Sequence, residues 1–92
     1  QNSTAQFKIY RRNSLLDSTM VKSYSDRADF TDHTLGEVAF SQNGSVKVWT
    51  YRTNTTRIVK NLAGNSSTIK GLYYINGELY ILRDKSLFKY IP

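Results

Sequence analysis

Two Asn-Gly dipeptides, each flanked by short apolar runs, constrain the fold of this 92-residue chain more than any other feature. A type I′ turn needs positive φ at both central residues, which Asn and Gly tolerate, so the pattern predicts two β-hairpins. The spacing of about 33 residues between the two turns predicts a repeated antiparallel meander. The runs and turns are Val38–Phe40, Asn43-Gly44 and Val46–Trp49, and then Leu72–Tyr74, Asn76-Gly77 and Leu79–Leu82.

We therefore expect an all-β fold with two antiparallel β-meander repeats in residues 37–92. Strand formers dominate this region, and no stretch of it has the apolar spacing of an amphipathic helix. A small barrel or a sandwich would satisfy the same pattern. Residues 1–36 are predicted to be an N-terminal extension, with a frayed start at residues 1–6 and a hairpin formed by strands at Phe7–Tyr10 and Leu15–Tyr24. An acidic loop is expected over Ser25–Gly36, and a linker over Ala63–Ser67.

The pleat of the last meander predicts two apolar faces. A two-residue loop at Asn76-Gly77 pairs Ile75 with Glu78 and Leu72 with Ile81, so alternate residues of both strands share a face. A solvated antiparallel sheet normally has one polar face, and this meander is therefore expected to be covered on both sides. Because 92 residues supply about one covering layer, we expect other subunits to complete the fold. The predicted interface residues are Tyr73, Tyr80, Leu82 and Leu87.

Composition argues against an enzyme. The chain has no cysteine and a single histidine, His33, so disulfides and thiolate metal sites are excluded. It has no Gly-x-Ser-x-Gly elbow and no phosphate-binding glycine loop, and we predict no catalytic residues, no metal and no cofactor. The acidic cluster of Asp26, Asp29, Asp32 and Glu37 lacks the glycine-bearing calcium-loop pattern and is predicted to be a solvated, turn-forming loop. No apolar stretch is long enough for a membrane span, and no signal peptide is visible.

The charge of the chain is unevenly distributed. Residues 1–40 carry as many acidic as basic side chains, so the net charge of +6 lies wholly in residues 41–92. This asymmetry predicts contact with an acidic protein or an anionic polymer rather than with specific bases. The cations expected to project outward are Lys47, Lys60, Lys70, Arg83, Lys85 and Lys89.

Aromatic and basic side chains alternate near the single tryptophan. Such alternation is typical of surfaces that stack bases while pairing phosphates. The competing interpretation, which we favour, is a tryptophan packed in the core beside a snorkelling lysine. The candidate binding residues are Lys47, Trp49, Tyr51, Arg52 and Arg57.

Residues 37–91 resemble the blades of β-propellers. The resemblance rests on Asn43-Gly44 and Asn76-Gly77 with the flanking Val48-Trp49 and Ile81-Leu82, and it lacks the signature motifs of named propeller families. Because two blades do not close a ring, the resemblance implies completion by other subunits. It also implies binding and scaffolding, as in phage tail and adsorption proteins. We therefore predict a non-enzymatic structural or adhesive module in a virion or extracellular appendage; the alternative is a nucleic-acid-binding β module.

Overall fold

The computed structural model describes residues 4–12, 17–59 and 69–92, and in these ranges it contains β-strands and no helix. The predicted all-β fold class is confirmed. The strands are β1 (Thr4–Arg12), β2 (Asp17–Ser25), β3 (Thr31–Thr34), β4 (Glu37–Gln42), β5 (Ser45–Thr50), β6 (Thr55–Ile58), β7 (Ile69–Ile75), β8 (Glu78–Arg83) and β9 (Ser86–Lys89).

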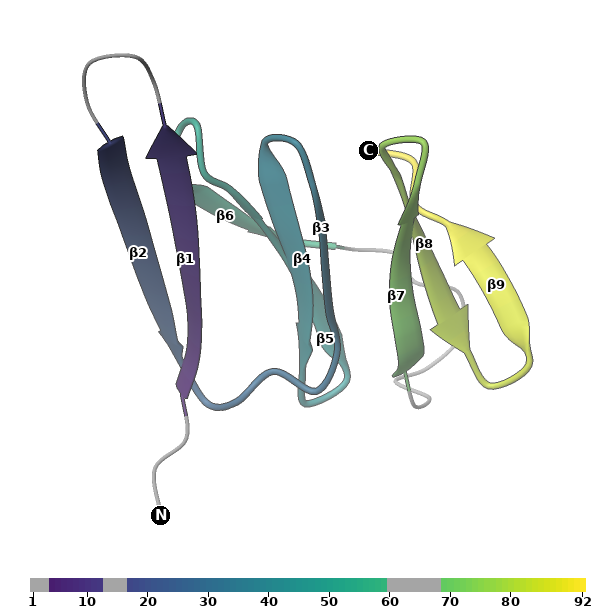
Figure 1. Cartoon of the computed structure of the whole chain (residues 1–92). Helices are drawn as coiled ribbons and strands as arrows, with labels where there is room; N and C mark the ends of the chain where they lie inside the picture. Colours follow the sequence, from purple (N-terminus) through teal and green to yellow (C-terminus); the bar gives the residue numbers. More distant parts are fainter. Residues whose placement is uncertain (1–3, 13–16, 60–68) are drawn as a thin grey trace.

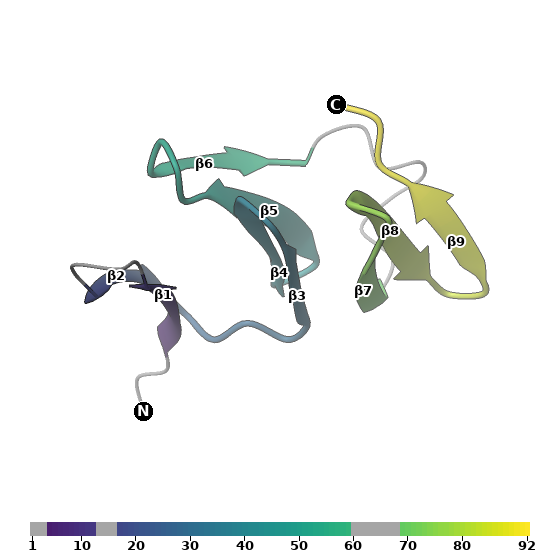
Figure 2. The same cartoon turned by 45° about the horizontal axis from the view of Figure 1, so that its top comes forward.

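These strands form three antiparallel sheets in which sequence neighbours pair with each other. They are a hairpin sheet (β1–β2), a central sheet (β3-β4-β5-β6) and a terminal sheet (β7-β8-β9). Figures 1 and 2 show the three sheets side by side, with the central sheet between the other two. The meander order is therefore as the sequence predicts.

Both Asn-Gly hairpins form as predicted. Asn43 and Asn76 have φ of 51° and 52°, and the glycine that follows each also has positive φ. Across the second turn Ile75 pairs with Glu78 and Leu72 pairs with Ile81, so the predicted register is confirmed.

The two Asn-Gly turns nevertheless occupy different places in their sheets. Asn43-Gly44 joins the second and third strands of the central sheet, whereas Asn76-Gly77 joins the first and second strands of the terminal sheet. The spacing of these turns therefore does not relate equivalent strands.

Two local predictions were wrong. Residues 31–34 form β3, paired with β4, although a loop was expected over Ser25–Gly36. β3 has no large apolar side chain, so the period-two hydrophobic signal of a half-buried strand is missing. Residues 4–6 belong to β1 rather than to a frayed end, because Ala5 is buried opposite Tyr24. The linker predicted over residues 63–67 lies outside the described residues.

The central sheet is buried on both faces. Toward the hairpin sheet it presents Val38, Phe40 and Trp49, and toward the terminal sheet it presents Ala39, Val46 and Val48. The first set packs against the hairpin residues Phe7, Ile9, Met20 and Tyr24; the second packs against Leu72, Leu79 and Ile81 of the terminal sheet.

Trp49 anchors the first of these two cores. Its side chain is fully buried, and its ring lies nearly parallel to that of Phe7, with centroids 6.5 Å apart. The indole Nε1 donates a 2.9 Å hydrogen bond to Asn54 Oδ1, so its polar group is satisfied inside the fold. The packed-core interpretation of this tryptophan is the one that the geometry supports.

We predict that Phe40→Ala destabilises the chain by about 3–5 kcal/mol, because it removes a fully buried ring that contacts Phe7 and Tyr24. Urea unfolding followed by the fluorescence of Trp49 measures the change. Tyr10→Ala is the matched control, since Tyr10 is 73% exposed, and its effect should stay within about 0.5 kcal/mol. Equal effects of the two substitutions would contradict this packing.

Candidate functional site

A polar seam joins the central sheet to the terminal sheet. The backbone N–H of Tyr74 donates to Asp32 Oδ2 at 2.7 Å, and the Tyr74 hydroxyl donates to Glu37 Oε2 at 2.7 Å. Arg57 lies 3.7 Å from Glu37 Oε1 and over the ring of Tyr90. These contacts come from five strands or strand ends, and they fix how the terminal sheet sits on the central one.

The environment of Tyr74 disfavours ionisation of its phenol. Burial and the hydrogen bond to the Glu37 carboxylate both raise the pKa of Tyr74 well above its ordinary value. Tyr74 therefore stays a hydrogen-bond donor to Glu37 at neutral pH.

The face of the terminal sheet that points away from the central sheet is apolar and exposed. We call this surface the outer face; its members are Tyr73, Ile75, Tyr80, Leu82 and Leu87. Tyr73 is 46% exposed, Ile75 47% and Leu87 52%, while Tyr80 and Leu82 are half-buried. All four predicted interface residues lie here together, and Ile75 joins them.

Gly71 shapes one end of the outer face. A Cβ at this position would lie 2.5 Å from the Tyr73 hydroxyl oxygen, so the phenol end of Tyr73 lies close over the backbone of Gly71. A side chain at Gly71 would displace the Tyr73 ring from this place.

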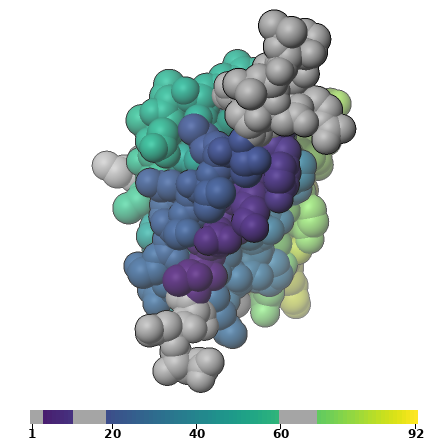
Figure 3. Space-filling view, turned by 60° about the vertical axis from the view of Figure 1, so that its left-hand side comes forward, coloured from purple at the N-terminus to yellow at the C-terminus, as the bar shows by residue number. Residues whose placement is uncertain are grey.

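The opposite end of the molecule has a different surface. The face of the hairpin sheet that points away from the central sheet carries Gln6, Lys8 and Ser23, and it also carries Val21 and Tyr10. Figure 3 looks onto this side, where atoms of β1 and β2 (purple and dark blue) lie in front. Side chains along β1 alternate between this exposed face and the face packed on the central sheet, as expected for a solvated antiparallel sheet.

The five candidate binding residues do not share one surface. Trp49 has no exposed surface and faces the hairpin sheet, whereas Arg57 projects from the other face of the central sheet toward Glu37. Lys47 donates to Gln42 Oε1 at 3.0 Å.

The side chains of the remaining two candidates contact Gly36, in the turn between β3 and β4. The Tyr51 hydroxyl accepts a 2.6 Å hydrogen bond from Gly36 N, and Arg52 lies beside the same glycine. Tyr51 falls in the loop after β5 rather than on the strand, because residues 51–54 form the turn to β6. These two side chains support a turn.

The predicted cations are also dispersed. Arg83 is buried, with its guanidinium over the ring of Phe88, and Lys89 donates to Glu78 Oε2 at 2.9 Å. Lys70 and Lys85 are exposed, and Lys60 lies outside the described residues. The cations that the structure describes form no continuous basic patch, and contact with an anionic polymer stays a prediction.

The acidic residues of the N-terminal half are separated by the fold. Asp32 belongs to the seam, Asp29 lies 3.6 Å from Arg27, and the peptide oxygen of Asp26 accepts from the Gln42 side chain. Among the described residues there is no group of three His, Asp or Glu side chains that could hold a metal ion.

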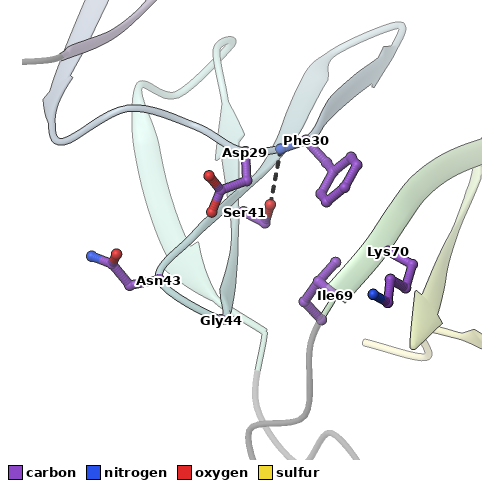
Figure 4. Close-up of a pocket in the computed structure, with 7 residues that line it drawn as sticks. All are labelled: Asp29, Phe30, Ser41, Asn43, Gly44, Ile69 and Lys70. Carbon is purple, nitrogen blue, oxygen red and sulfur yellow. Dashed lines mark hydrogen bonds between the residues drawn. The ribbon is translucent and has the colours of Figure 1, made fainter. Parts of the chain in front are cut away.

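An open cavity of about 530 Å³ lies between the end of the central sheet and the start of β7 (Figure 4). Within it Phe30 N donates to Ser41 Oγ at 3.0 Å, so this hydroxyl is engaged in holding the chain before β3 against β4. Its lining is Asp29, Phe30, Ser41, Asn43, Gly44, Ile69 and Lys70.

Sequence reasoning missed the seam because its partners are 37 and 42 residues apart. The sequence does contain one signal of the position of Glu37. The dipeptide Gly36-Glu37 recurs as Gly77-Glu78, and each copy lies at the turn into the second strand of its sheet.

Comparison with protein-family models, with curated proteins and with solved structures finds no match. Over the described residues, no helix is long and apolar enough to cross a membrane. The candidate site therefore rests on geometry, and the outer face is the strongest candidate.

We predict that Tyr74→Phe lowers the free energy of unfolding at neutral pH by about 1–2 kcal/mol, since it removes a hydrogen bond to a carboxylate. Because the pKa of Tyr74 is raised in the folded state, the free energy of unfolding also depends on pH. Above about pH 10 the unfolded tyrosine loses its proton while the folded one keeps it, so stability falls as pH rises.

Urea unfolding at neutral and alkaline pH measures both effects. The variant should lose less stability than the wild type above about pH 10, because it has one fewer phenol to ionise in the unfolded state. Tyr10→Phe, at an exposed phenol, is the control. An identical alkaline slope for Tyr74→Phe and the wild type would contradict the seam.

Proposed function

We propose that this chain is a non-enzymatic structural or adhesive module that binds another protein through the outer face. One observation carries the proposal: the outer face gathers five apolar or aromatic side chains in one patch, whereas the exposed face of the hairpin sheet interleaves Tyr10 and Val21 with the polar Gln6, Lys8 and Ser23.

The composition of the outer face is that of a protein-binding surface. Tyrosines are enriched at the centres of interfaces, where they combine large apolar area with a hydroxyl that bonds at the edge. The ion pair between Glu78 and Lys89 lies on the same face and supplies a polar rim. Clustered apolar side chains of this size mark interaction sites more often than solvent-facing surface.

The stacked arrangement favours a module of a larger assembly. Successive meander sheets pack face to face, as the blades of β-propellers do. This packing supports the resemblance to propeller blades that the sequence of residues 37–91 suggests. We propose a virion or extracellular appendage as the setting, by analogy with the phage tail and adsorption proteins that use such modules. The nucleic-acid alternative is not advanced, because Trp49 is buried and Arg57 faces another direction.

The test is self-association of the free chain. Without its partner the outer face should pair with copies of itself at high protein concentration, so Tyr80→Lys or Leu87→Lys should shift the chain to monomer in sedimentation velocity. Val21→Lys is the matched control. Val21 is 51% exposed, but it lies on the face of the hairpin sheet that carries Gln6, Lys8 and Ser23. Its substitution should therefore leave association unchanged.

Association through an apolar surface should also persist as salt rises, whereas binding through phosphate-type contacts weakens steeply. A monodisperse wild-type monomer that binds no hydrophobic dye would contradict the proposal. Equal effects of Val21→Lys and Tyr80→Lys would contradict it as well.

A further inference from the structure

The central and terminal sheets share one pairing register at a displacement of 41 residues. In β3–β4, Asp32 pairs with Ala39 and Thr34 with Glu37; adding 41 gives the Tyr73–Tyr80 and Ile75–Glu78 pairs of β7–β8. The match continues in the next ladder, where all four pairs of β8–β9 equal pairs of β4–β5 plus 41. Strands β7, β8 and β9 thus correspond to β3, β4 and β5.

This correspondence also preserves direction. Val38, Phe40 and Trp49 of the central sheet face the preceding sheet, and their equivalents Leu79, Ile81 and Tyr90 face the preceding sheet as well. We call this the leading face of a sheet, and the opposite one its trailing face. Each leading face packs on the trailing face of the sheet before it.

The outer face is the trailing face of the terminal sheet. On the central sheet the trailing positions Ala39, Val46 and Val48 are fully buried beneath the terminal sheet. Their equivalents are Tyr80, Leu87 and Lys89, and Leu87 is 52% exposed. The same structural position is therefore covered in one sheet and open in the next.

We infer that the outer face binds the leading face of a further antiparallel sheet of this same kind. The inference rests on the proposed function and names its partner. The partner sheet lies on the terminal sheet as the terminal sheet lies on the central one, so the new interface continues the existing one.

The leading faces of the central and terminal sheets define the chemistry of the partner. Each presents a branched aliphatic residue, a large apolar residue and an aromatic residue at equivalent places, namely Val38, Phe40 and Trp49 or Leu79, Ile81 and Tyr90. The partner also supplies a hydrogen-bond donor for Glu78, because its equivalent Glu37 accepts from the Tyr74 hydroxyl of the following sheet.

One contact is not repeated. Asp32, which accepts the backbone N–H of Tyr74, corresponds to Tyr73. The partner's edge strand is therefore held by apolar packing on Tyr73 and not by a carboxylate.

A second copy of this chain does not offer the required face. The leading faces of its central and terminal sheets are covered, and its hairpin sheet turns outward a face on which Gln6, Lys8 and Ser23 interrupt Tyr10 and Val21. Head-to-tail stacking would press the Lys8 ammonium and the hydrogen-bonded pair Gln6–Ser23 against Tyr73 and Leu87, at a cost in desolvation. Pairing of copies outer face to outer face is an outcome that the test separates.

The test fuses a partner sheet to the full chain. A flexible Gly/Ser linker of about 12 residues, spanning about 20 Å, joins Pro92 to a second copy of residues 28–92, in which the terminal sheet covers the trailing face of the central sheet and the leading face of the central sheet is free to dock. The chain has no cysteine, so Leu87→Cys reports exposure of the outer face through its rate of labelling by a thiol reagent. Labelling is done at low protein concentration.

The matched control carries Phe40→Lys and Trp49→Lys in the appended copy alone. We expect labelling at Leu87→Cys to be at least ten-fold slower in the docking fusion than in this control, whereas a Val21→Cys reporter should label equally in both. Equal labelling of Leu87→Cys in both fusions overturns the inference.

The outcomes distinguish the two proposals. If the unfused chain protects Leu87→Cys as its own concentration rises, but neither fusion does so at low concentration, copies pair outer face to outer face; the protein-binding function then stands and the partner inference fails. If the unfused chain stays monomeric, binds no dye and gains no protection from the fusion, both proposals fail.

Discussion

The two-sided burial of the central sheet is the constraint on which the rest of the molecule depends. Along β4 and β5 alternate side chains point to opposite faces, and both sets are apolar, so neither face can be left in water. The hairpin sheet and the terminal sheet satisfy this requirement from the two sides. The protein is therefore a stack of layers whose order follows the order of the chain.

Apolar packing and polar contacts make different contributions to joining the layers. Aliphatic side chains form most of the core between the central and terminal sheets, but such contacts tolerate sliding. The hydrogen bonds from Tyr74 to Asp32 and Glu37 are directional, and they select one alignment of the two sheets. Burial of a satisfied tyrosine at this place gives the stack its register.

Much of the fold could be predicted from local sequence, because tight turns determine pairing. Asn76-Gly77 alone sets which residues of β7 and β8 oppose each other, and the observed pairs follow. β3 was not predictable in this way, since its Thr and His side chains carry no hydrophobic period and its stability comes from pairing with β4. The seam was not predictable either, because it joins residues that only packing of the layers brings together.

The candidate site was predicted in part for the same reason. The faces of the last meander follow from the pleat, so Tyr73, Tyr80, Leu82 and Leu87 were grouped correctly, although nothing in the sequence says which face the fold leaves open. Trp49 and Arg57 are close in sequence but project to opposite sides of the sheet. Residues that are close in sequence therefore do not share a surface here.

The alternation along β4 and β5 also divides the interior into two cores that share backbone but no side chains. Loss of the contacts in one core leaves the side chains of the other in place, on strands that still pair. We expect the terminal sheet to be a separate unit of local unfolding, opening at a lower free energy than the hairpin and central sheets together. In hydrogen exchange such an architecture would give two tiers of protection, with the amides of β7–β9 exchanging faster than those of β1–β6.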